Sequence, residues 1–391
     1  MAKRSRLHFR RPARRGRVIV CGSCQEELDS NATPNDHDGV LFCDECYETV
    51  TAAGATWFVA HVDHCFVTGS SDEVLVPLSK PPLGRAAPST LPLAKAVSRA
   101  RRWLATADAV VIVAGAGMSR DSGLPDFRGR DGWYSMGEEG NDRKIAMDQV
   151  CYQSGSEHFD VSWQLARAML RAFRSCEPHA GYAKLQEAFG GNGCFVLTSN
   201  IDGYFAEAGF DKKRLFETHG SAHRLQCASY KRDETEACAG AWPLPDADAE
   251  ALLEAEAVPR CRTCHGVARP NVSHVTDEDE DVDASVTGPQ RSRLLRWLKR
   301  HWRLDRKLVV LEVGTGISPH SLRFDSELLA ARHGSKLIRI DPGEADVPDS
   351  KRCVGLKMGA LEALTRLCAQ EEPPAPKDAR EAGAFDEAGL T

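Results

Sequence analysis

Four runs of apolar residues along the chain each end in a glycine or a polar residue. The runs and their exits read AVVIVAGAG from Ala109, CFVLTSNID from Cys194, LVVLEVGTG from Leu308 and KLIRIDP from Lys336. The first run has β-branched residues at all of positions 110–113, as expected of a parallel strand that is covered on both faces. The pattern predicts buried strands of one parallel sheet.

Stretches with a helical distribution of apolar residues lie between these runs. SRARRWLATA precedes the first run, HFDVSWQLARAMLRAF and GYAKLQEAF precede the second, and FDSELLAARHG precedes the last. This alternation predicts an α/β protein with a doubly wound, Rossmann-like parallel sheet. Ligands of such sheets bind beyond the carboxyl ends of the strands. The polar residues that follow the four runs are therefore expected to meet in one crevice: Ser119, Asn200, Asp202, Thr315 and Asp341.

The first run ends abruptly at Gly115 and Gly117. Glycines in this place let the phosphates of a dinucleotide approach the backbone. A tight strand-to-helix turn needs glycine as well, so this pair alone favours the two interpretations about equally.

Composition and a proline-rich stretch divide the chain into segments. Its 391 residues are 42% hydrophobic, which is enough for a globular core and about two domains. The proline-rich stretch at 77–94 indicates a semi-rigid linker. The expected segments are a basic disordered tail (1–17), a small zinc module (18–76), the linker (77–94), a catalytic domain (95–370) and a disordered tail (371–391).

The basic tail at 1–17 contains eight Lys or Arg residues and no acidic residue. It is compatible with a nuclear signal, a nucleic-acid-binding arm or an organelle transit peptide, and equally with a plain solvated tail. The net charge of the whole chain is −6. We therefore expect nucleic-acid contact only through this tail or the module that follows it.

Two Cys-x-x-Cys pairs follow the basic tail. Cys21 and Cys24 form the first pair, and Cys43 and Cys46 form the second after eighteen intervening residues. This spacing is typical of zinc ribbons and treble clefs. A segment of this size has little apolar core, so a metal ion would supply much of its folding free energy. We expect a second zinc site here.

Several motifs occur in one order downstream of the linker. They are GAGMSRDSGLPDFRG, TSNIDGYFAEAGF, THGS, a group of four cysteines, and the strands LEVG and LIRID. With these motifs, residues 95–370 resemble the sirtuins, the family of NAD-dependent protein deacylases. The resemblance implies a Rossmann-like sheet that carries a small zinc-binding lobe at about residues 222–275.

The resemblance also implies that NAD is the cofactor and that its pyrophosphate and ribose lie on the glycine loop. Backbone amides at a helix start favour anions, in agreement with that position. Without the family, Asp126 and Arg128 would be interpreted as a local surface ion pair. The implied cofactor-binding residues are Ala114, Gly115, Ala116, Gly117, Ser119, Asp126, Phe127, Arg128, Ser199, Asn200, Asp202, Gly314, Thr315, Gly316 and Asp341.

His219, in THGS, matches the general base of the family, which removes a proton from a ribose hydroxyl. Histidine suits this task because its ordinary pKa lies near 6.5. The chain has 13 histidines, and a single one in a loop is more often structural, so the assignment depends on the neighbouring Gly220 and Ser221 and on motif order. Asn200 and Asp202 match residues on the nicotinamide side and complete the implied catalytic set.

Ser199 departs from the family pattern, which has TQNID where this chain has TSNIDG. A serine reaches less far than a glutamine, so a ribose contact would pass to water or to a neighbouring group. A microbial subgroup of sirtuins has serine at this position, which makes Ser199 a trait of that subgroup. We expect this departure to change the rate of the reaction more than the fold.

The four cysteines behind His219 match the structural zinc site of the family. They are Cys227, Cys238, Cys261 and Cys264, and four thiolates leave no open coordination position for a substrate. Disulfides are the alternative. No signal peptide or transmembrane run is evident in the sequence, and thiols inside cells stay reduced, so we favour zinc.

The expected substrate site is less complete. An acidic run at 277–283 stands where sirtuins have a segment that pairs with the substrate backbone; it is either a solvated loop or a docking patch for basic tails such as those of histones. Val272 and Val275 remain as walls of an acyl-lysine channel. Ala166 and Met169 align with the tyrosine and arginine of sirtuins that remove acidic acyl groups, so we expect a neutral acyl group such as acetyl.

The sequence thus predicts an NAD-dependent protein-lysine deacylase, a transferase that moves the acyl group to ADP-ribose and releases nicotinamide. The first alternative is a mono-ADP-ribosyltransferase or NAD hydrolase on the same fold. The second is an NAD-binding, zinc-bridged scaffold without activity. The expected partners are acyl-lysine proteins and not membranes, and the expected location is intracellular: nuclear or cytoplasmic, with mitochondria as the alternative.

Overall fold

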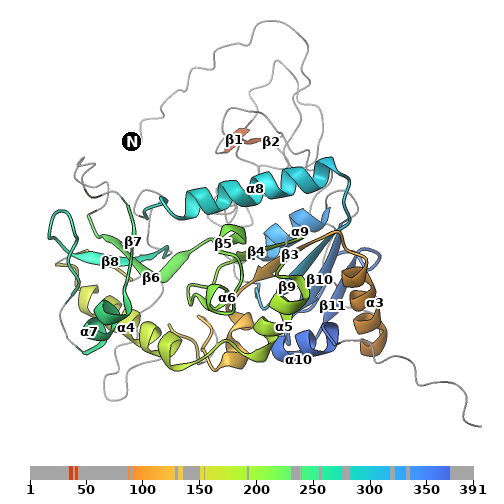
Figure 1. Ribbon diagram of the computed structural model, residues 1–391, viewed down its shortest axis with the longest axis horizontal. Coiled ribbons are helices and arrows are strands. Elements are labelled where there is room, and N and C mark those ends of the chain that lie inside the picture. Colours follow the sequence, from red (N-terminus) through yellow and green to blue (C-terminus); the bar gives the residue numbers. More distant parts are fainter. Residues whose placement is uncertain are drawn as a thin grey trace, which may run out of the picture.

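We describe the protein from a computed structural model (Figure 1). The described residues are 35–37, 40–42, 87–88, 91–127, 131–134, 150–153, 155–191, 193–229, 238, 240–254, 258–274, 282–317, 322–331 and 335–369. The cysteines expected in the amino-terminal zinc module, both expected tails, Arg128, Val275 and most of the acidic run lie outside them. Of the module, only a two-stranded antiparallel hairpin is described, β1 (Asn35–His37) with β2 (Val40–Phe42).

A six-stranded parallel sheet forms the centre of the molecule. Its strand order is β11-β10-β9-β3-β4-β5, and all five neighbouring pairs are parallel. This confirms the predicted doubly wound α/β class. The strands are β3 (Ala109–Ala114), β4 (Cys194–Thr198), β5 (Leu215–Glu217), β9 (Leu308–Val313), β10 (Lys336–Ile340) and β11 (Cys353–Leu356).

Helices cover both faces of this sheet, as β3 shows. Val110 and Ile112 pack into one core, and Val111 and Val113 pack into the other, because successive side chains of a strand point to opposite faces. Figure 1 shows one helical layer above the sheet and one below it. The upper layer is α8 (Thr287–Arg303) and α9 (Arg323–Ala331); the lower layer is α3 (Leu93–Ala105), α5 (Ala180–Phe189) and α10 (Ala360–Leu367).

The ends of two helices differ from the sequence pattern. The helix before β3 begins at Leu93, after Pro92 at its N-cap position, and therefore includes the last two residues of the expected linker. Proline fits at a helix start because the N–H that it lacks would have no partner there. The helix before β10 ends at Ala331, three residues before Gly334.

A small lobe extends from the sheet on the left of Figure 1. It contains an antiparallel sheet of order β7-β6-β8, with helix α7 (Asp246–Glu254) beside α4 (Phe159–Ser175). The strands are β6 (Gly220–Cys227), β7 (Trp242–Pro243) and β8 (Ala268–Val272). Within the described part of the chain, no helix has the length and apolar character needed to cross a bilayer.

Candidate active site

The turn after β3 packs directly against the turn after β9. The amide of Gly117 donates to the carbonyl oxygen of Gly314 over 2.9 Å. A Cβ atom on Gly115 would lie 2.6 Å from that same oxygen, and one on Gly117 would lie 2.6 Å from the Cα of Gly314. These distances leave no space for a side chain. The glycines are therefore needed for the contact between two turns, whatever ligand the turns hold.

Four buried side chains form one hydrogen-bonded group behind these turns. Ser119 follows the helical turn η1 (Ala116–Met118), and its hydroxyl donates to the carboxylate of Asp202 over 2.6 Å. Because its single proton is used there, Ser119 accepts from the amide of Asn200 at 3.1 Å and from the hydroxyl of Tyr182 at 2.9 Å. All four residues are less than 6% exposed. Three of the predicted site residues are thus brought together.

The side-chain carbonyl oxygen of Asn200 lies in this group without a hydrogen bond from any described residue. A buried acceptor without a donor is costly. The oxygen is itself buried, and a donor that would satisfy it is not among the described residues. The group is therefore a candidate ligand site.

Burial raises the pKa values of two members of this group, Asp202 and Tyr182. Burial raises the pKa of the Asp202 carboxyl, although hydrogen bonds from Ser119 and from the backbone N–H of Tyr204 oppose the change. Burial and the neighbouring Asp202 raise the pKa of the Tyr182 phenol well above its ordinary range. Tyr182 therefore keeps its proton and its role as a donor to Ser119.

Backbone and hydroxyl contacts hold the exit of β4 against β3. The hydroxyl of Thr198 donates to the carbonyl oxygen of Ala114 over 3.0 Å, and the amide of Ser199 donates to the same oxygen over 3.1 Å. The amide of Asn200 in turn donates to the Thr198 hydroxyl. Ser199 is half-buried, and its backbone contact does not depend on which side chain it carries.

His219 lies at the same edge, where the sheet meets the small lobe. The amide of Thr218 donates to the carbonyl oxygen of Thr198 over 2.8 Å, and the carbonyl oxygen of His219 accepts from the amide of Ser273 over 3.0 Å. Gly220 has a φ of +77°, and a Cβ atom there would lie 2.1 Å from the carbonyl oxygen of Asn271. Glycine is therefore required next to His219, and the backbone of this half-buried histidine is fixed from both sides.

The exits of β9 and β10 complete the edge. The hydroxyl of Thr315 donates to the carboxylate of Glu312 over 2.7 Å. That carboxylate also accepts from the fully buried guanidinium of Arg339, 2.7 Å away. Asp341 uses a carboxylate oxygen to accept from the amides of Gly343 and Glu344 in its own turn. The predicted residues Gly314, Thr315, Gly316 and Asp341 thus lie at the same edge of the sheet as Asn200 and His219.

The DFR segment lies beyond the helical turn η2 (Arg120–Ser122). The carbonyl oxygen of Asp126 accepts from the amide of Trp133 over 2.8 Å, and the ring of Phe127 lies 5.8 Å from that of Tyr134. These contacts fold the segment back on itself.

Three residues of the site escaped the sequence analysis: Tyr182, His179 and His223. His179 caps α5, because its Nδ1 accepts from the amide of Gly181 while its Nε2 donates to the carbonyl oxygen of Met118 over 2.8 Å. His223 contacts the carbonyl oxygen of Asp202 over 2.7 Å. A histidine directly before a helix and a tyrosine in its first turn were the available signals for His179 and Tyr182.

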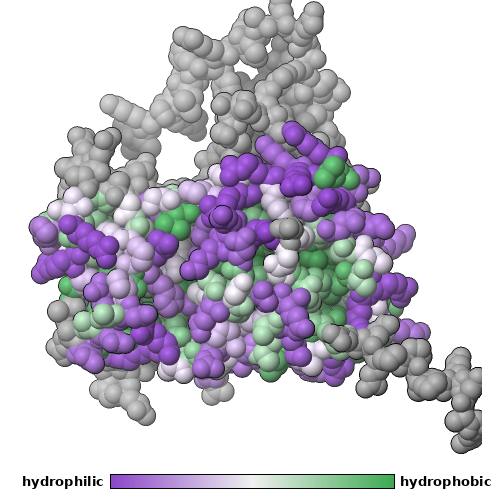
Figure 2. Space-filling model, viewed as in Figure 1, coloured by the Kyte–Doolittle hydropathy of each residue, from purple (hydrophilic) through white to green (hydrophobic). Residues whose placement is uncertain are grey.

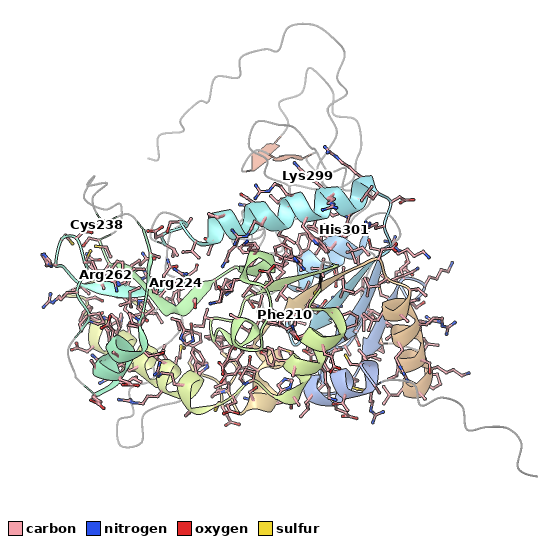
Figure 3. All side chains as sticks on the ribbon, in the orientation of Figure 1. Phe210, Arg224, Cys238, Arg262, Lys299 and His301 are labelled. Atoms are coloured by element: carbon pink, nitrogen blue, oxygen red, sulfur yellow. The ribbon has the colours of Figure 1, made fainter. Side chains whose placement is uncertain are left out.

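The four predicted cysteine ligands meet at the outer end of the lobe, where Figure 3 labels Cys238. Their sulfur atoms all lie within 4.8 Å of one another. The sulfurs of Cys227 and Cys264 are 3.7 Å apart, and those of Cys238 and Cys261 are 4.0 Å apart. Four thiolates about 2.3 Å from a tetrahedral zinc ion would be about 3.8 Å apart. The cluster fits zinc, and the described cysteines form no disulfide.

Backbone amides support the second pair of thiols. The amides of Thr263 and Gly266 donate to the sulfurs of Cys261 and Cys264, each over 3.4 Å. Burial alone would raise the pKa of the Cys261 thiol, but the backbone N–H groups of Cys264 and Thr263, with the neighbouring thiols, lower it to about 7. The local backbone therefore favours the thiolate form at Cys261, whereas burial raises the pKa of the Cys238 thiol to about 11.

An apolar pocket lies between α4 and the lobe. Three of its lining residues carry a polar side-chain group: Tyr152, Trp163 and His274. No lysine or arginine is among the lining residues. Its position beside β8 agrees with the channel expected at Val272. The lining residues are Tyr152, Trp163, Ala166, Met169, Leu170, Ile201, Ala222, Leu225, Leu244, Leu252, Pro270, Val272 and His274.

Comparison with known proteins assigns the family. The Sir2 family profile matches residues 115–286. An NAD-dependent protein deacetylase of Cutibacterium acnes is 32% identical over 199 residues, which cover 49% of this chain and 72% of that protein. The chain belongs to the Sir2 family. The resemblance to sirtuins that the motifs indicated is therefore confirmed.

Two further relatives of this sirtuin are informative. A probable bifunctional ADP-ribose hydrolase/ADP-ribosyltransferase of Fusarium oxysporum is 29% identical over 289 residues, 66% of this chain and 45% of that protein. The crystal structure of a Sir2 homologue in complex with NAD has the same fold, with a TM-score of 0.50 at 20% identity over 69% of this chain and 92% of the other. The sirtuin spans 60–64% of the length of several other curated relatives.

Proposed function

We propose that this sirtuin removes acyl groups from lysine side chains of proteins in an NAD-dependent reaction. The observation that carries the proposal is the side-chain oxygen of Asn200. It belongs to the buried Ser119–Asp202 group, accepts no hydrogen bond from a described residue, and lies at the same sheet edge as His219. A carboxamide such as that of nicotinamide offers an N–H donor to this oxygen. Relatives named as NAD-dependent protein deacetylases and deacylases support the same reaction class.

The residues at this edge of the sheet would have different roles in the reaction. The two glycine turns and Thr315 would hold the cofactor at the ends of β3 and β9, while Asn200 and Asp202 would fix the nicotinamide end. NAD supplies a ribose carbon whose bond to nicotinamide can be broken. His219 would accept a proton from a ribose hydroxyl, because a neutral imidazole is a suitable base near pH 7. The zinc ion would hold the lobe and take no part in the chemistry.

The apolar pocket is the proposed acyl-lysine site. Ala166 and Met169, the positions aligned with an acid-binding tyrosine and arginine, both line it. No lysine or arginine is among the residues that line the pocket, and burying an unpaired charge is costly. A neutral acyl group, such as acetyl, therefore fits. Basic protein tails, including those of histones, are the protein substrates that we expect, within an intracellular compartment.

The test is turnover of an acetyl-lysine peptide. Purified protein is incubated with NAD and peptide, and nicotinamide and peptide mass are followed together. Wild type should release nicotinamide and deacetylated peptide in equal amounts, and His219→Ala should lose about 100-fold or more of the rate. His158→Ala, in a half-buried histidine before α4 and outside this group, should lose much less. Faster turnover of a succinyl-lysine peptide would contradict the neutral acyl preference.

ADP-ribosyl transfer is the second candidate, and two observations favour it. The Fusarium relative carries ADP-ribosyltransferase in its name and matches over 289 residues. Ser199 replaces the glutamine of the usual family pattern at the exit of β4. In the same assay, nicotinamide release without a change in peptide mass, together with labelling of an added protein by ADP-ribose, would select this candidate. If no nicotinamide were released, the remaining alternative would be an NAD-binding scaffold without activity.

A further inference from the structure

The outward face of α8 is a continuous cationic stripe. The helix contains six Lys or Arg residues and no acidic residue within Thr287–Arg303. Four of the six are exposed: Arg296, Lys299, Arg300 and Arg303. In Figure 3, Lys299 points away from the sheet while His301 points toward it, and Figure 2 shows hydrophilic residues along the edge that α8 forms.

A second element widens this stripe. The helical turn η4 (Lys212–Arg214) precedes β5, and the guanidinium of Arg293 donates to the carbonyl oxygen of Lys213 over 3.1 Å. Lys212 and Lys213 are both exposed. The basic surface, defined here as Lys212, Lys213, Arg296, Lys299, Arg300 and Arg303, therefore joins two elements that are 70 or more residues apart in the chain.

Ion pairs within the protein do not account for this surface. Among the described residues, no carboxylate lies within ion-pair distance of Arg296, Lys299, Arg300 or Arg303. Asp211, the acid nearest in sequence to the η4 lysines, pairs with Arg214. The repeating spacings of three and four residues place like charges next to each other on the helix, which destabilises it.

The helix dipole explains only part of the pattern. Cations stabilise the last turn of a helix, and this accounts for Arg300 and Arg303. It does not account for Arg296 and Lys299, which lie farther from the helix end, or for the lysines of η4. The remaining cations give the surface a positive charge that would attract an anionic partner.

The side chains favour a phosphate backbone over an acidic protein. Arginine, which supplies three of the four exposed cations on α8, matches phosphate oxygens with two parallel donors. Protein interfaces are anchored by buried aromatic or aliphatic groups. The outward stripe has none, since its other exposed positions are Pro289 and Ser292, and Leu304 beyond the helix is a single exposed apolar side chain. From Arg296 to Arg303 the helix rises about 10 Å, a length that spans successive phosphates.

We infer that the basic surface of α8 and η4 binds nucleic acid through its phosphates, without reading base sequence. This places a nucleic-acid contact on the catalytic domain itself, in addition to any contact by the basic amino-terminal tail. The inference does not depend on the proposed deacylase activity. It predicts binding that weakens steeply with salt, because each phosphate contact releases counterions.

The test is fluorescence anisotropy of the full chain with a labelled 30-base-pair DNA duplex and a 30-nucleotide RNA, from 50 to 200 mM NaCl. One variant carries Arg296→Gln, Lys299→Gln, Arg300→Gln and Arg303→Gln. Its matched control carries Lys95→Gln, Arg102→Gln, Lys351→Gln and Lys357→Gln, four exposed cations on other elements. Both keep the basic tail, so the difference between them isolates α8.

The α8 variant should bind about tenfold or more weakly at 100 mM salt, and its slope of log affinity against log salt should fall by about 3 to 4. The control should stay close to wild type. Nicotinamide release and melting temperature of the α8 variant should not fall, which excludes misfolding. Equal losses in both variants, no binding by wild type, or tighter binding of polyglutamate of matched charge than of either nucleic acid would overturn the inference.

Discussion

The sheet edge and the cysteine lobe are stabilised in different ways, although both contribute to one site. The edge has a large apolar core on each side, contacts between glycine turns and a buried hydrogen-bonded group. Around the cysteines, the buried cluster consists of Cys227, Cys238 and Cys261, with Trp242 packed against them. The edge is therefore stabilised by packing, whereas we expect a bound metal to stabilise the outer, cysteine-bearing end of the lobe.

The two regions meet at the backbone of His219, which bonds to Ser273 beyond β8. Loss of the metal should therefore act on the lobe and pocket first and on the glycine turns last. Comparison of the two regions thus predicts which substitutions impair acyl-lysine binding and which impair cofactor binding.

The largest expected effect is that of metal removal. A structural zinc ion contributes on the order of 10 kcal/mol to the folding of small domains, so Cys261→Ser with Cys264→Ser should unfold the lobe and lower deacylation at least about 100-fold. NAD binding, measured by calorimetry, should change much less. Cys176→Ser, in a half-buried cysteine outside the cluster, is the control. Equal loss of NAD binding and deacylation would show that the two regions are not separable.

The next effect concerns the contact between the two turns. Gly314 has a φ of +60°, and a Cβ atom there would lie 2.4 Å from the backbone of Gly117, so Gly314→Ala adds a clash to backbone strain. We expect a loss of about 3 kcal/mol or more in the free energy of unfolding. Gly316→Ala, with a φ of +65° and no atom within 4 Å of its Cβ, should lose only about 1 kcal/mol. If both variants lost the same free energy of unfolding in urea, the clash with Gly117 would not explain the loss.

The buried group should tolerate little change. Asp202→Asn keeps the shape but weakens acceptance of the Ser119 proton, and we expect about 1–3 kcal/mol of lost stability with at least tenfold slower nicotinamide release. Asp349→Asn, in a half-buried carboxylate that accepts from the amide of Lys351 in its own turn, should cost less in both measurements. Chemical denaturation and initial rates measure the two effects. A fully active Asp202→Asn enzyme would contradict the assigned role.

The smallest effect is a dependence of stability on pH. Burial lowers the pKa of His179 below its ordinary value of 6.5, although the hydrogen bond to the Met118 carbonyl and the nearby Asp121 carboxylate oppose the change. The native state therefore binds this proton less readily than the unfolded state. The stabilisation is complete above pH 6.5 and is lost as pH falls through the lowered pKa, by at most about 1.4 kcal/mol per pH unit.

His179→Asn should reduce this dependence, because asparagine can still cap the helix. Urea midpoints at pH 7.5 and 5.5 measure it. His158→Asn is the matched control, since His158 also precedes a helix but caps nothing with its side chain. If the wild type and His179→Asn respond to acid identically, His179 is not the group responsible.

The strands and the site were predictable to different degrees from the sequence. β3, β4, β9 and β10 were predicted because each is a long apolar run. β5 and β11 have only three and four residues and gave too little pattern. α8 was missed because its basic residues mask the apolar positions Leu294 and Leu298, which have a helical spacing.

Contacts within the site could not be derived from spacing. Ser119 and Asp202 are 83 residues apart, and only the shared edge of the sheet suggested that they meet. The part played by Tyr182 requires the tertiary structure, because nothing in GYAKLQEAF distinguishes a ligand-side hydroxyl from a core aromatic ring. The proposed roles of Arg128 and of the amino-terminal cysteines remain predictions, because these residues lie outside the described ranges.

The turn-to-turn contact of Gly117 and Gly314 also limits how the enzyme can be redesigned. Each glycine occupies the volume that a methyl group would need in the other turn, so libraries that randomise either position should return glycine almost alone. Variation aimed at a different nucleotide should start at Asp341, whose side chain, among the described residues, hydrogen-bonds to two amides of its own turn.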